Sequence, residues 1–180
     1  LYHTNKSNSP FIYSPLQLNE GFKAPIDVQY VALTGNFKEA NYKFTGSLHV
    51  FQKAVSTDYL WTKVRVLGGA YGCMCGFGRS GASYFVSYRD PNLKNTIDVY
   101  HQVLDFIDDF NPTNDEMLKY IIGAVGSFDF PKSPSNKGNY ALNSYLQGLT
   151  IEDYRKEKKE LIDTKVEDIK ALRPYIKAIF

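Results

Sequence analysis

Hydrophobic and polar residues follow two different periods in the first part of the chain. The segment 25–37, PIDVQYVALTGNF, is rich in β-branched and aromatic residues and ends in a turn signal, so it predicts a first strand. From Phe44 to Leu67 the apolar positions recur at helical spacing, and residues 56–58, Ser-Thr-Asp, are typical of a helix break and a new cap. We therefore expect one helix and then a second, short one.

A hairpin is predicted next. The segments AYGCMCGF and ASYFVSY flank GRSG, residues 78–81, whose glycines suit a tight reversal between antiparallel strands. Tyr71 then stands at the start of the first of these strands. Beyond the hairpin, Asp90 is expected to cap a helix with Pro91 at its first position. Apolar residues at intervals of three and four, through Phe110, predict that this helix packs on a sheet.

Helices are also predicted for the C-terminal part. Thr113 and Glu116 have the spacing of a capping box, residues 130–138, FPKSPSNKG, indicate a loop, and residues 139–149 indicate another helix.

The last thirty residues are densely charged but keep an apolar helical stripe, which indicates a solvated helical face rather than a basic interaction tail. Thr164 and Glu167 have capping-box spacing, and Pro174 is expected to kink or end the last helix. Strand, helices, hairpin and several helices in that order predict an α+β fold: a mostly antiparallel sheet with helices packed on one face and a helical C-terminal extension.

Composition and charge narrow the function classes. The 180 residues are 43% hydrophobic and 22% charged, which fits one soluble globular domain with its own core. Twenty-one basic and nineteen acidic residues leave a net charge of +2, so we expect no nucleic-acid partner. No run approaches the roughly 18 to 20 apolar residues that a membrane span needs, and the first ten residues lack the apolar centre of a signal peptide.

The two cysteines, Cys73 and Cys75, are expected to be small buried residues of a strand. On a strand their Cα atoms are ~6.5 to 7 Å apart, at the limit of disulfide geometry, so a structural disulfide is not expected. A metal or redox role is the alternative. The paired free thiols fit a reducing compartment.

Catalytic motifs of the common kinds are missing from the sequence. His3, His49 and His101 have no partners at zinc-helix spacing, so no complete metal site is expected in this chain. Ser80 lies in GRSGAS, a hairpin turn rather than a nucleophile elbow. Arg65 and Tyr71 remain as candidates, because the glycine pair between them lets the backbone approach a ligand closely.

The run STDYLWTKVRVLGGAYGCMCGFGRSGASYFVSYRDPNL closely resembles the C-terminal region of the insulinase (pitrilysin) superfamily of zinc metallopeptidases, in its presequence-protease branch. NEGFKAPIDVQYVALTGNF and GSLHVFQKAVSTDYLW resemble the same domain, and a weaker likeness continues to the end of the chain. The resemblance implies an irregular segment 1–18 and, over 19–180, a metallopeptidase-like α/β roll that forms the last of four related domains.

In that family an inverted H-x-x-E-H helix and a distal glutamate hold the catalytic zinc in the first domain, so the resemblance implies zinc in the parent enzyme and none in this chain. The last domain closes over an unstructured peptide substrate, opposite the N-terminal catalytic half. It contributes an arginine and a tyrosine that fall on Arg65 and Tyr71, with Gly68 and Gly69 also facing substrate. Tyr71 would stabilise the oxyanion and Arg65 would clamp the peptide.

Two readings of this likeness remain open: a substrate-binding domain of a peptide-degrading enzyme, or a noncatalytic structural or interaction subunit of the same fold. Retention of both Arg65 and Tyr71 favours the first. A stand-alone ligand-binding module is a more distant third. We expect the chain by itself to be inactive, and the parent to work in a bacterial cytoplasm, with a mitochondrial or plastid matrix as the alternative.

Overall fold

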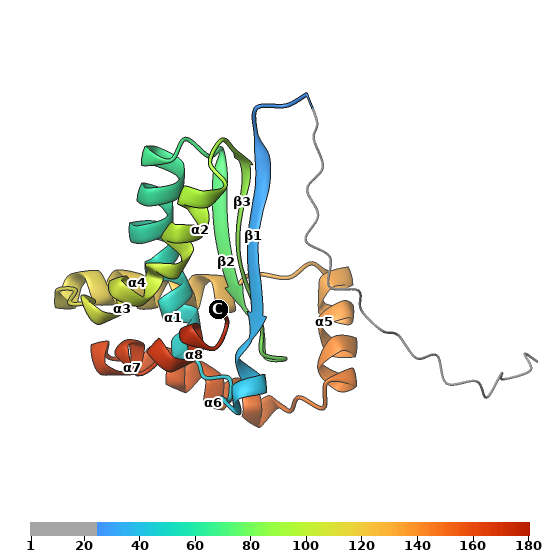
Figure 1. Cartoon of the computed structure of the whole chain (residues 1–180). Helices are drawn as coiled ribbons and strands as arrows, with labels where there is room; N and C mark the ends of the chain where they lie inside the picture. Colours follow the sequence, from blue (N-terminus) through green and yellow to red (C-terminus); the bar gives the residue numbers. More distant parts are fainter. Residues whose placement is uncertain (1–24) are drawn as a thin grey trace, which may run out of the picture.

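A computed structural model of the protein describes residues 25–180. The irregular segment 1–18 and His3 lie outside the described residues. In the described part three strands form one sheet, and helices cover one of its faces (Figure 1). None of the helices in residues 25–180 is both long and apolar enough to cross a membrane.

The sheet is antiparallel, with strand order β1-β3-β2. Its strands are β1 (Gln29–Asn36), β2 (Gly72–Phe77) and β3 (Ala82–Asp90). The first strand and the hairpin are thus confirmed. Gly81 closes the hairpin turn with φ of +90°, a conformation that other residues rarely adopt.

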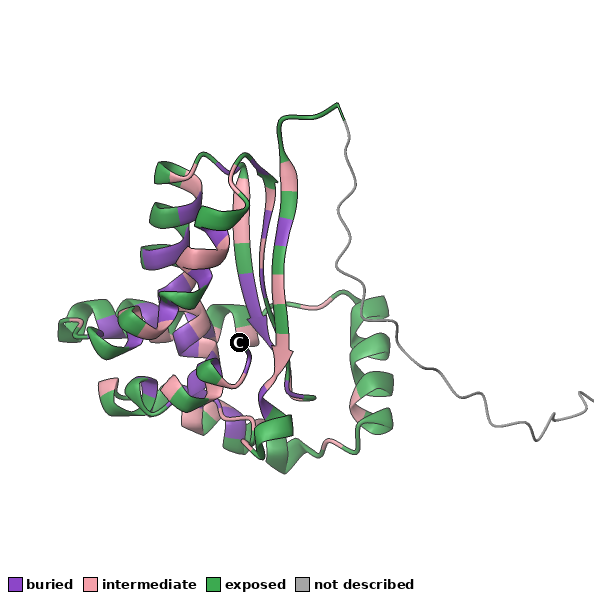
Figure 2. Cartoon of the chain, viewed as in Figure 1, coloured by how far each residue is buried: buried purple, intermediate pink, exposed green. Residues whose placement is uncertain are grey.

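The two faces of the sheet differ in what covers them. Along β3, Phe85 and Ser87 are buried under the helices, while Tyr84 on the other face is exposed. The register places Cys73 opposite Ser87 and Cys75 opposite Phe85, so both cysteines share the covered face. Buried positions accordingly gather between the sheet and the helices (Figure 2).

On the open face, two tyrosines of β3 lie across two glycines of β2. Tyr88 is paired with Gly72 and Tyr84 with Gly76. A Cβ atom on Gly72 would come within 2.4 Å of the Tyr88 ring, and one on Gly76 within 2.6 Å of the Tyr84 ring. The aromatic rings therefore occupy the space that side chains on β2 would need.

The expected break at residues 56–58 is wrong. After the short η1 (Phe37–Ala40), helix α1 (Ser47–Ala54) continues without a cap into η2 (Val55–Leu67), which has π-helical hydrogen bonding. The Thr57 hydroxyl donates back to the Lys53 carbonyl at 2.9 Å instead of capping a new helix. Asp58 accepts a hydrogen bond from Tyr120.

Asp90 does not cap the next helix. Strand β3 runs to Asp90, and α2 (Lys94–His101) begins four residues later, after Pro91. The Asp90 carboxylate is fully buried and bonds Thr96 instead. Helix α3 (Val103–Asp108) follows, and Tyr100, Val103 and Ile107 form the buried stripe that packs on the sheet and η2.

Helix α4 (Asn114–Phe128) confirms the capping box: Glu116 N–H bonds the Thr113 hydroxyl, and the Glu116 carboxylate accepts from Thr113 N–H. Helix α5 (Pro134–Leu146) confirms the next helix but begins inside the predicted loop. Ser133 caps it and Pro134 occupies its first turn, where a missing N–H costs nothing. No residue of α5 is buried, and the helix stands off from the body (Figure 1).

Three helices close the chain: α6 (Ile151–Ile162), α7 (Val166–Lys170) and α8 (Arg173–Lys177).

Two predictions for this region are wrong. The Thr164 hydroxyl donates to the Glu160 carbonyl, so it does not form a capping box with Glu167, and the cap lies one residue later at Lys165. Pro174 stands in the first turn of α8, so it begins that helix instead of ending one.

Candidate functional site

The predicted site residues lie on the connection between η2 and β2. Arg65 is in the last turn of η2, and Tyr71 directly precedes β2. Gly68 ends the helix, and Gly69 has φ of +79° while its N–H bonds the Arg65 carbonyl at 3.0 Å. Because a side chain is strained at that φ, glycine at position 69 allows the chain to turn sharply from helix to strand.

Arg65 is oriented by an aromatic ring. Its guanidinium carbon lies 3.8 Å from the centre of the Trp61 ring, one turn earlier in η2, in a cation–π contact. The Arg65 side chain is half-buried and its charge acts on Cys73: burial raises the pKa of the Cys73 thiol to about 11, and the nearby arginine opposes that rise.

Tyr71 is 59% exposed and rests against the end of β3. Its ring centre is 5.4 Å from that of Tyr88, and the Arg89 guanidinium lies 5.5 Å from the Tyr71 ring. The Tyr71 N–H also donates to the Arg89 carbonyl at 3.3 Å. The backbone of Tyr71 is thus hydrogen-bonded to the end of β3, while more than half of the residue is exposed to solvent.

The structure places Arg65 and Tyr71 at the two ends of one glycine turn. The Arg65 side chain packs on Trp61 and the Tyr71 ring packs against Tyr88. Across residues 25–180 no hydrogen bond joins their side chains directly. Exposure of Tyr71 and partial exposure of Arg65 leave both able to meet a ligand. That they face a common substrate, together with Gly68 and Gly69, stays a prediction.

The two cysteines are free thiols. Cys75 is buried and Cys73 half-buried. Burial raises the pKa of Cys75 to about 12, although a 3.4 Å contact with the Ser56 hydroxyl opposes the rise. Burial thus disfavours the thiolate form of both cysteines, which supports the prediction that they act as packing residues.

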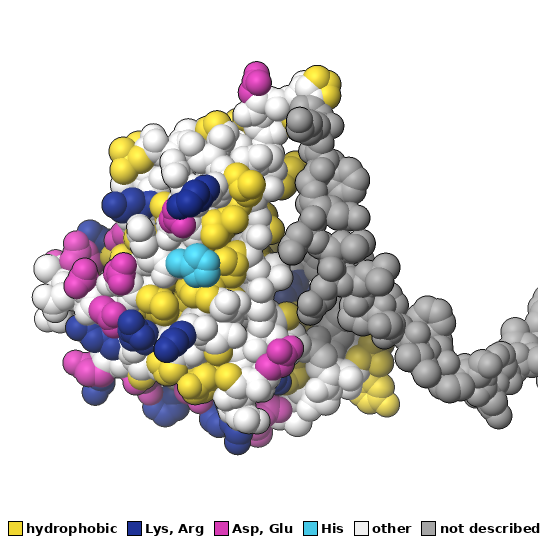
Figure 3. Space-filling view, viewed as in Figure 1, with side chains coloured by type: hydrophobic (Ala, Val, Ile, Leu, Met, Phe, Trp, Pro, Cys, Tyr) yellow, Lys and Arg dark blue, Asp and Glu magenta, His cyan; other side chains and the backbone are white. Residues whose placement is uncertain are grey.

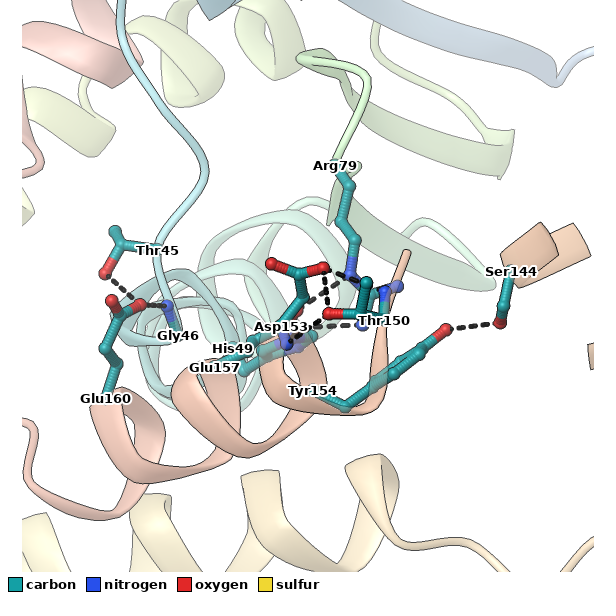
Figure 4. A network of polar contacts seen from close by, with 10 residues as sticks. All are labelled: Thr45, Gly46, His49, Arg79, Ser144, Thr150, Asp153, Tyr154, Glu157 and Glu160. Carbon is teal, nitrogen blue, oxygen red and sulfur yellow. Dashed lines mark hydrogen bonds and ion pairs between the residues drawn. The ribbon is translucent and has the colours of Figure 1, made fainter. Parts of the chain in front are cut away.

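A second cluster, which the sequence did not predict, joins α1, the hairpin turn and α6 (Figure 4). The Glu157 carboxylate accepts from Arg79 Nε at 2.7 Å and Nη2 at 2.9 Å, and bonds His49 Nε2 at 2.7 Å. The Glu157 side chain is only 9% exposed. The Arg79 guanidinium also lies 4.9 Å from the Tyr154 ring centre.

Hydrogen bonds and opposite charges stabilise the ionised form of Glu157 in this cluster. Burial by itself raises the pKa of Glu157, but the hydrogen bonds from His49 and Arg79 outweigh it and hold the pKa below its usual value. Glu160, one turn later in α6, accepts the Gly46 N–H at 2.9 Å at the start of α1. These contacts tie two helices that are more than a hundred residues apart in sequence.

The described residues do not fit a resident metal. No group of three or more His, Cys, Asp or Glu residues within residues 25–180 is arranged to hold an ion. His49 is hydrogen-bonded to Glu157, and His101 packs edge-on against Phe180 with ring centres 4.7 Å apart.

On the face shown in Figure 3, Lys and Arg side chains are interspersed with Asp and Glu.

The fold has a counterpart among solved structures. A crystal structure described as a "putative zinc protease" from Bordetella pertussis Tohama I superimposes with a TM-score of 0.61, over 85% of this chain and 91% of that one. The two sequences are 12% identical, so this likeness concerns the fold alone.

The chain belongs to the PreP C-terminal domain family, whose sequence profile matches residues 19–176. Protein HypA of Clostridium perfringens is 45% identical over 159 residues, and presequence protease 1, chloroplastic/mitochondrial, of Arabidopsis thaliana is 38% identical over 153 residues. These alignments cover 88% and 84% of this chain, but only 16% and 14% of the two relatives. The chain thus corresponds to about a seventh of their length, and the resemblance to the presequence-protease branch is confirmed.

Proposed function

We propose that this chain is the substrate-facing C-terminal domain of a peptide-degrading zinc metalloendopeptidase, and that its Arg65–Tyr71 connection is one half of a split active site. Family membership supports the proposal, since a presequence protease is among the relatives. The observation that carries it is the exposed Tyr71 at the end of a glycine turn, with Arg65 at the other end.

Within this proposal Tyr71 acts as a hydrogen-bond donor. The carbonyl oxygen of a scissile peptide bond gains negative charge during hydrolysis, and a phenol O–H placed beside it stabilises that charge once water is excluded. Arg65 offers a permanent charge and several donors for substrate carbonyls or a terminal carboxylate. The Gly68–Gly69 turn leaves room for the peptide backbone between them.

Zinc belongs to another domain of the parent in this proposal, because the described residues offer no ligand cluster. The partners are an unstructured peptide and the N-terminal catalytic half, which would complete the site. A bacterial cytoplasm is the proposed compartment, and an organelle matrix is the alternative; relatives of both origins exist.

Steady-state kinetics of the full-length parent test the proposal. Tyr71→Phe removes one donor and keeps the ring, so kcat should fall roughly 10²- to 10³-fold, as for loss of one oxyanion donor. Arg65→Ala should also raise KM, because a clamp binds substrate as well as transition state. Tyr145→Phe, on the exposed face of α5, is the matched control. A Tyr71→Phe enzyme with wild-type kcat would make Tyr71 an ordinary tyrosine without a catalytic role. A wild-type parent that cleaves no peptide would instead favour the noncatalytic subunit.

A further inference from the structure

The connection from Gly68 to Tyr71 is held at both ends by one short segment, residues 88–92. Asn92 Nδ2 donates to the Gly68 carbonyl at 2.5 Å, at the start of the connection. At its end, the Tyr71 N–H bonds the Arg89 carbonyl, and the Tyr71 ring rests on Tyr88. The segment 88–92 therefore sets where the turn begins and where Tyr71 leaves it.

A buried carboxylate fixes this segment in place. Asp90 is 0% exposed, and its two oxygens accept three hydrogen bonds. Oδ1 accepts the Asn92 N–H at 2.8 Å, and Oδ2 accepts the Ser87 hydroxyl at 2.5 Å and the Thr96 hydroxyl at 2.8 Å. Because a buried polar group is costly unless it is hydrogen-bonded, these contacts hold β3, Asn92 and α2 in one arrangement.

The backbone beside Asp90 has a conformation that fits this role. Arg89 has φ of +48°, which is uncommon for a residue with a side chain. With this backbone conformation the Arg89 carbonyl accepts the Tyr71 N–H, while the side chain of Asp90 is buried. At its helix end the glycine turn is held by two backbone bonds, from the Gly69 N–H to the Arg65 carbonyl at 3.0 Å and from the Ala70 N–H to the Val64 carbonyl at 3.2 Å. The contacts from Asn92 and Arg89 add the link between this turn and the end of β3.

Resting on the proposed function, we infer that Asn92 is a positioning residue of the half-site. Its side-chain amide fixes the Gly68 carbonyl, and its backbone is fixed by Asp90. Asn92 thereby sets the spacing and direction of Arg65 and Tyr71 without touching substrate. A displacement of about 1 Å in a positioned catalytic group can cost about 10²-fold in rate.

The experiment uses the full-length parent with Asn92→Ala and Asn92→Asp. The second variant keeps the size of the side chain and loses the amide donor to Gly68. Both should lower kcat by about 10- to 100-fold, and should speed amide hydrogen exchange in a peptide covering Gly68–Tyr71. Asn95→Ala, an exposed asparagine in the first turn of α2, is the matched control and should change neither quantity.

A double-mutant cycle separates positioning from general support. If Asn92 acts through Tyr71, Asn92→Ala in a Tyr71→Phe enzyme should lower kcat much less than it does in the wild type. If Asn92→Ala lowers kcat by the same factor in the Tyr71→Phe enzyme as in the wild type, the inference is overturned. It is also overturned by unchanged exchange at Gly68–Tyr71, by a wild-type kcat in both Asn92 variants, or by unfolding of both, which would make Asn92 merely structural.

Failure of the proposed function gives a different pattern. In that case Tyr71→Phe alone leaves kcat unchanged. The positioning role of Asn92 is then refuted as well, whatever the hydrogen-exchange data show. When Tyr71→Phe lowers kcat as expected but Asn92→Ala does not, only the role of Asn92 is refuted.

Discussion

Glu157 carries a prediction about stability that the geometry makes quantitative. Glu157→Gln removes the charge that bonds Arg79 twice and His49 once, at 2.7 to 2.9 Å. Breaking a buried ion pair by removing one partner costs about 3 to 5 kcal/mol. Arg79 is 29% exposed and the new amide keeps one acceptor oxygen, so the cost should be nearer 2 to 3 kcal/mol.

Urea denaturation of this chain at neutral pH, followed by circular dichroism, measures that cost. Glu152→Gln is the control, because Glu152 also pairs with an arginine, Arg155, but both side chains are more than 70% exposed. Exposed pairs contribute about 0 to 1 kcal/mol. The midpoint should therefore drop clearly for Glu157→Gln and hardly at all for Glu152→Gln, with unchanged slopes. Equal losses in the two variants would refute the argument.

Acid provides a further check with a defined sign. The pKa of Glu157 is lower in the folded protein than its usual value of 4.5. The carboxylate thus stabilises the fold fully above pH 4.5, and this contribution is lost as the pH falls through the lowered pKa. The difference in unfolding free energy between wild type and Glu157→Gln should shrink over that acid range. A difference that is constant down to pH 3 would contradict the assignment.

Two other outcomes concern the metal and the thiols. This chain by itself should neither retain stoichiometric zinc after dialysis nor cleave an unstructured peptide, and metal analysis with a peptide-cleavage assay checks both. Replacing Cys73 and Cys75 with Ala should cost about 1 to 3 kcal/mol through lost packing while leaving the parent's activity intact; loss of activity in a folded variant would restore the redox reading.

Local signals predicted the elements that depend on local chemistry. Alternating residues and the glycines of the turn indicated the β2–β3 hairpin, and the three-residue spacing of Thr113 and Glu116 gave the start of α4. These features follow from bonds between near neighbours in sequence. They hold wherever tertiary contacts do not compete with them.

Tertiary contacts account for several of the errors. Residues 56–58 have cap-forming types, yet Asp58 bonds Tyr120 of α4 and the helix continues. Thr164 has the spacing for a capping box, yet its hydroxyl bonds Glu160 and Ser47. In each case a polar side chain that favours a helix end when isolated finds a partner elsewhere in the fold.

The candidate site was only partly accessible from sequence. The residues themselves made Arg65, Tyr71 and the glycine pair candidates, but only the family resemblance gave them roles, since composition alone does not distinguish them from an ordinary surface arginine and strand tyrosine. Asn92 and the Glu157 cluster gave no signal. His49 and Glu157 are 108 positions apart, and no periodic pattern connects residues at such a separation.

The rings of Tyr84 and Tyr88 that lie across Gly76 and Gly72 have a consequence for how this domain can evolve. Each ring fills the space of a missing side chain, so neither glycine can acquire one while its tyrosine stays in place. A larger residue on β2 requires the facing tyrosine ring to move aside or to be replaced by a smaller side chain, so the order of the two substitutions matters. The open face therefore couples its strands genetically: Gly72 with Tyr88 and Gly76 with Tyr84 form two epistatic pairs, in which the effect of a substitution at the glycine depends on the residue at the tyrosine position.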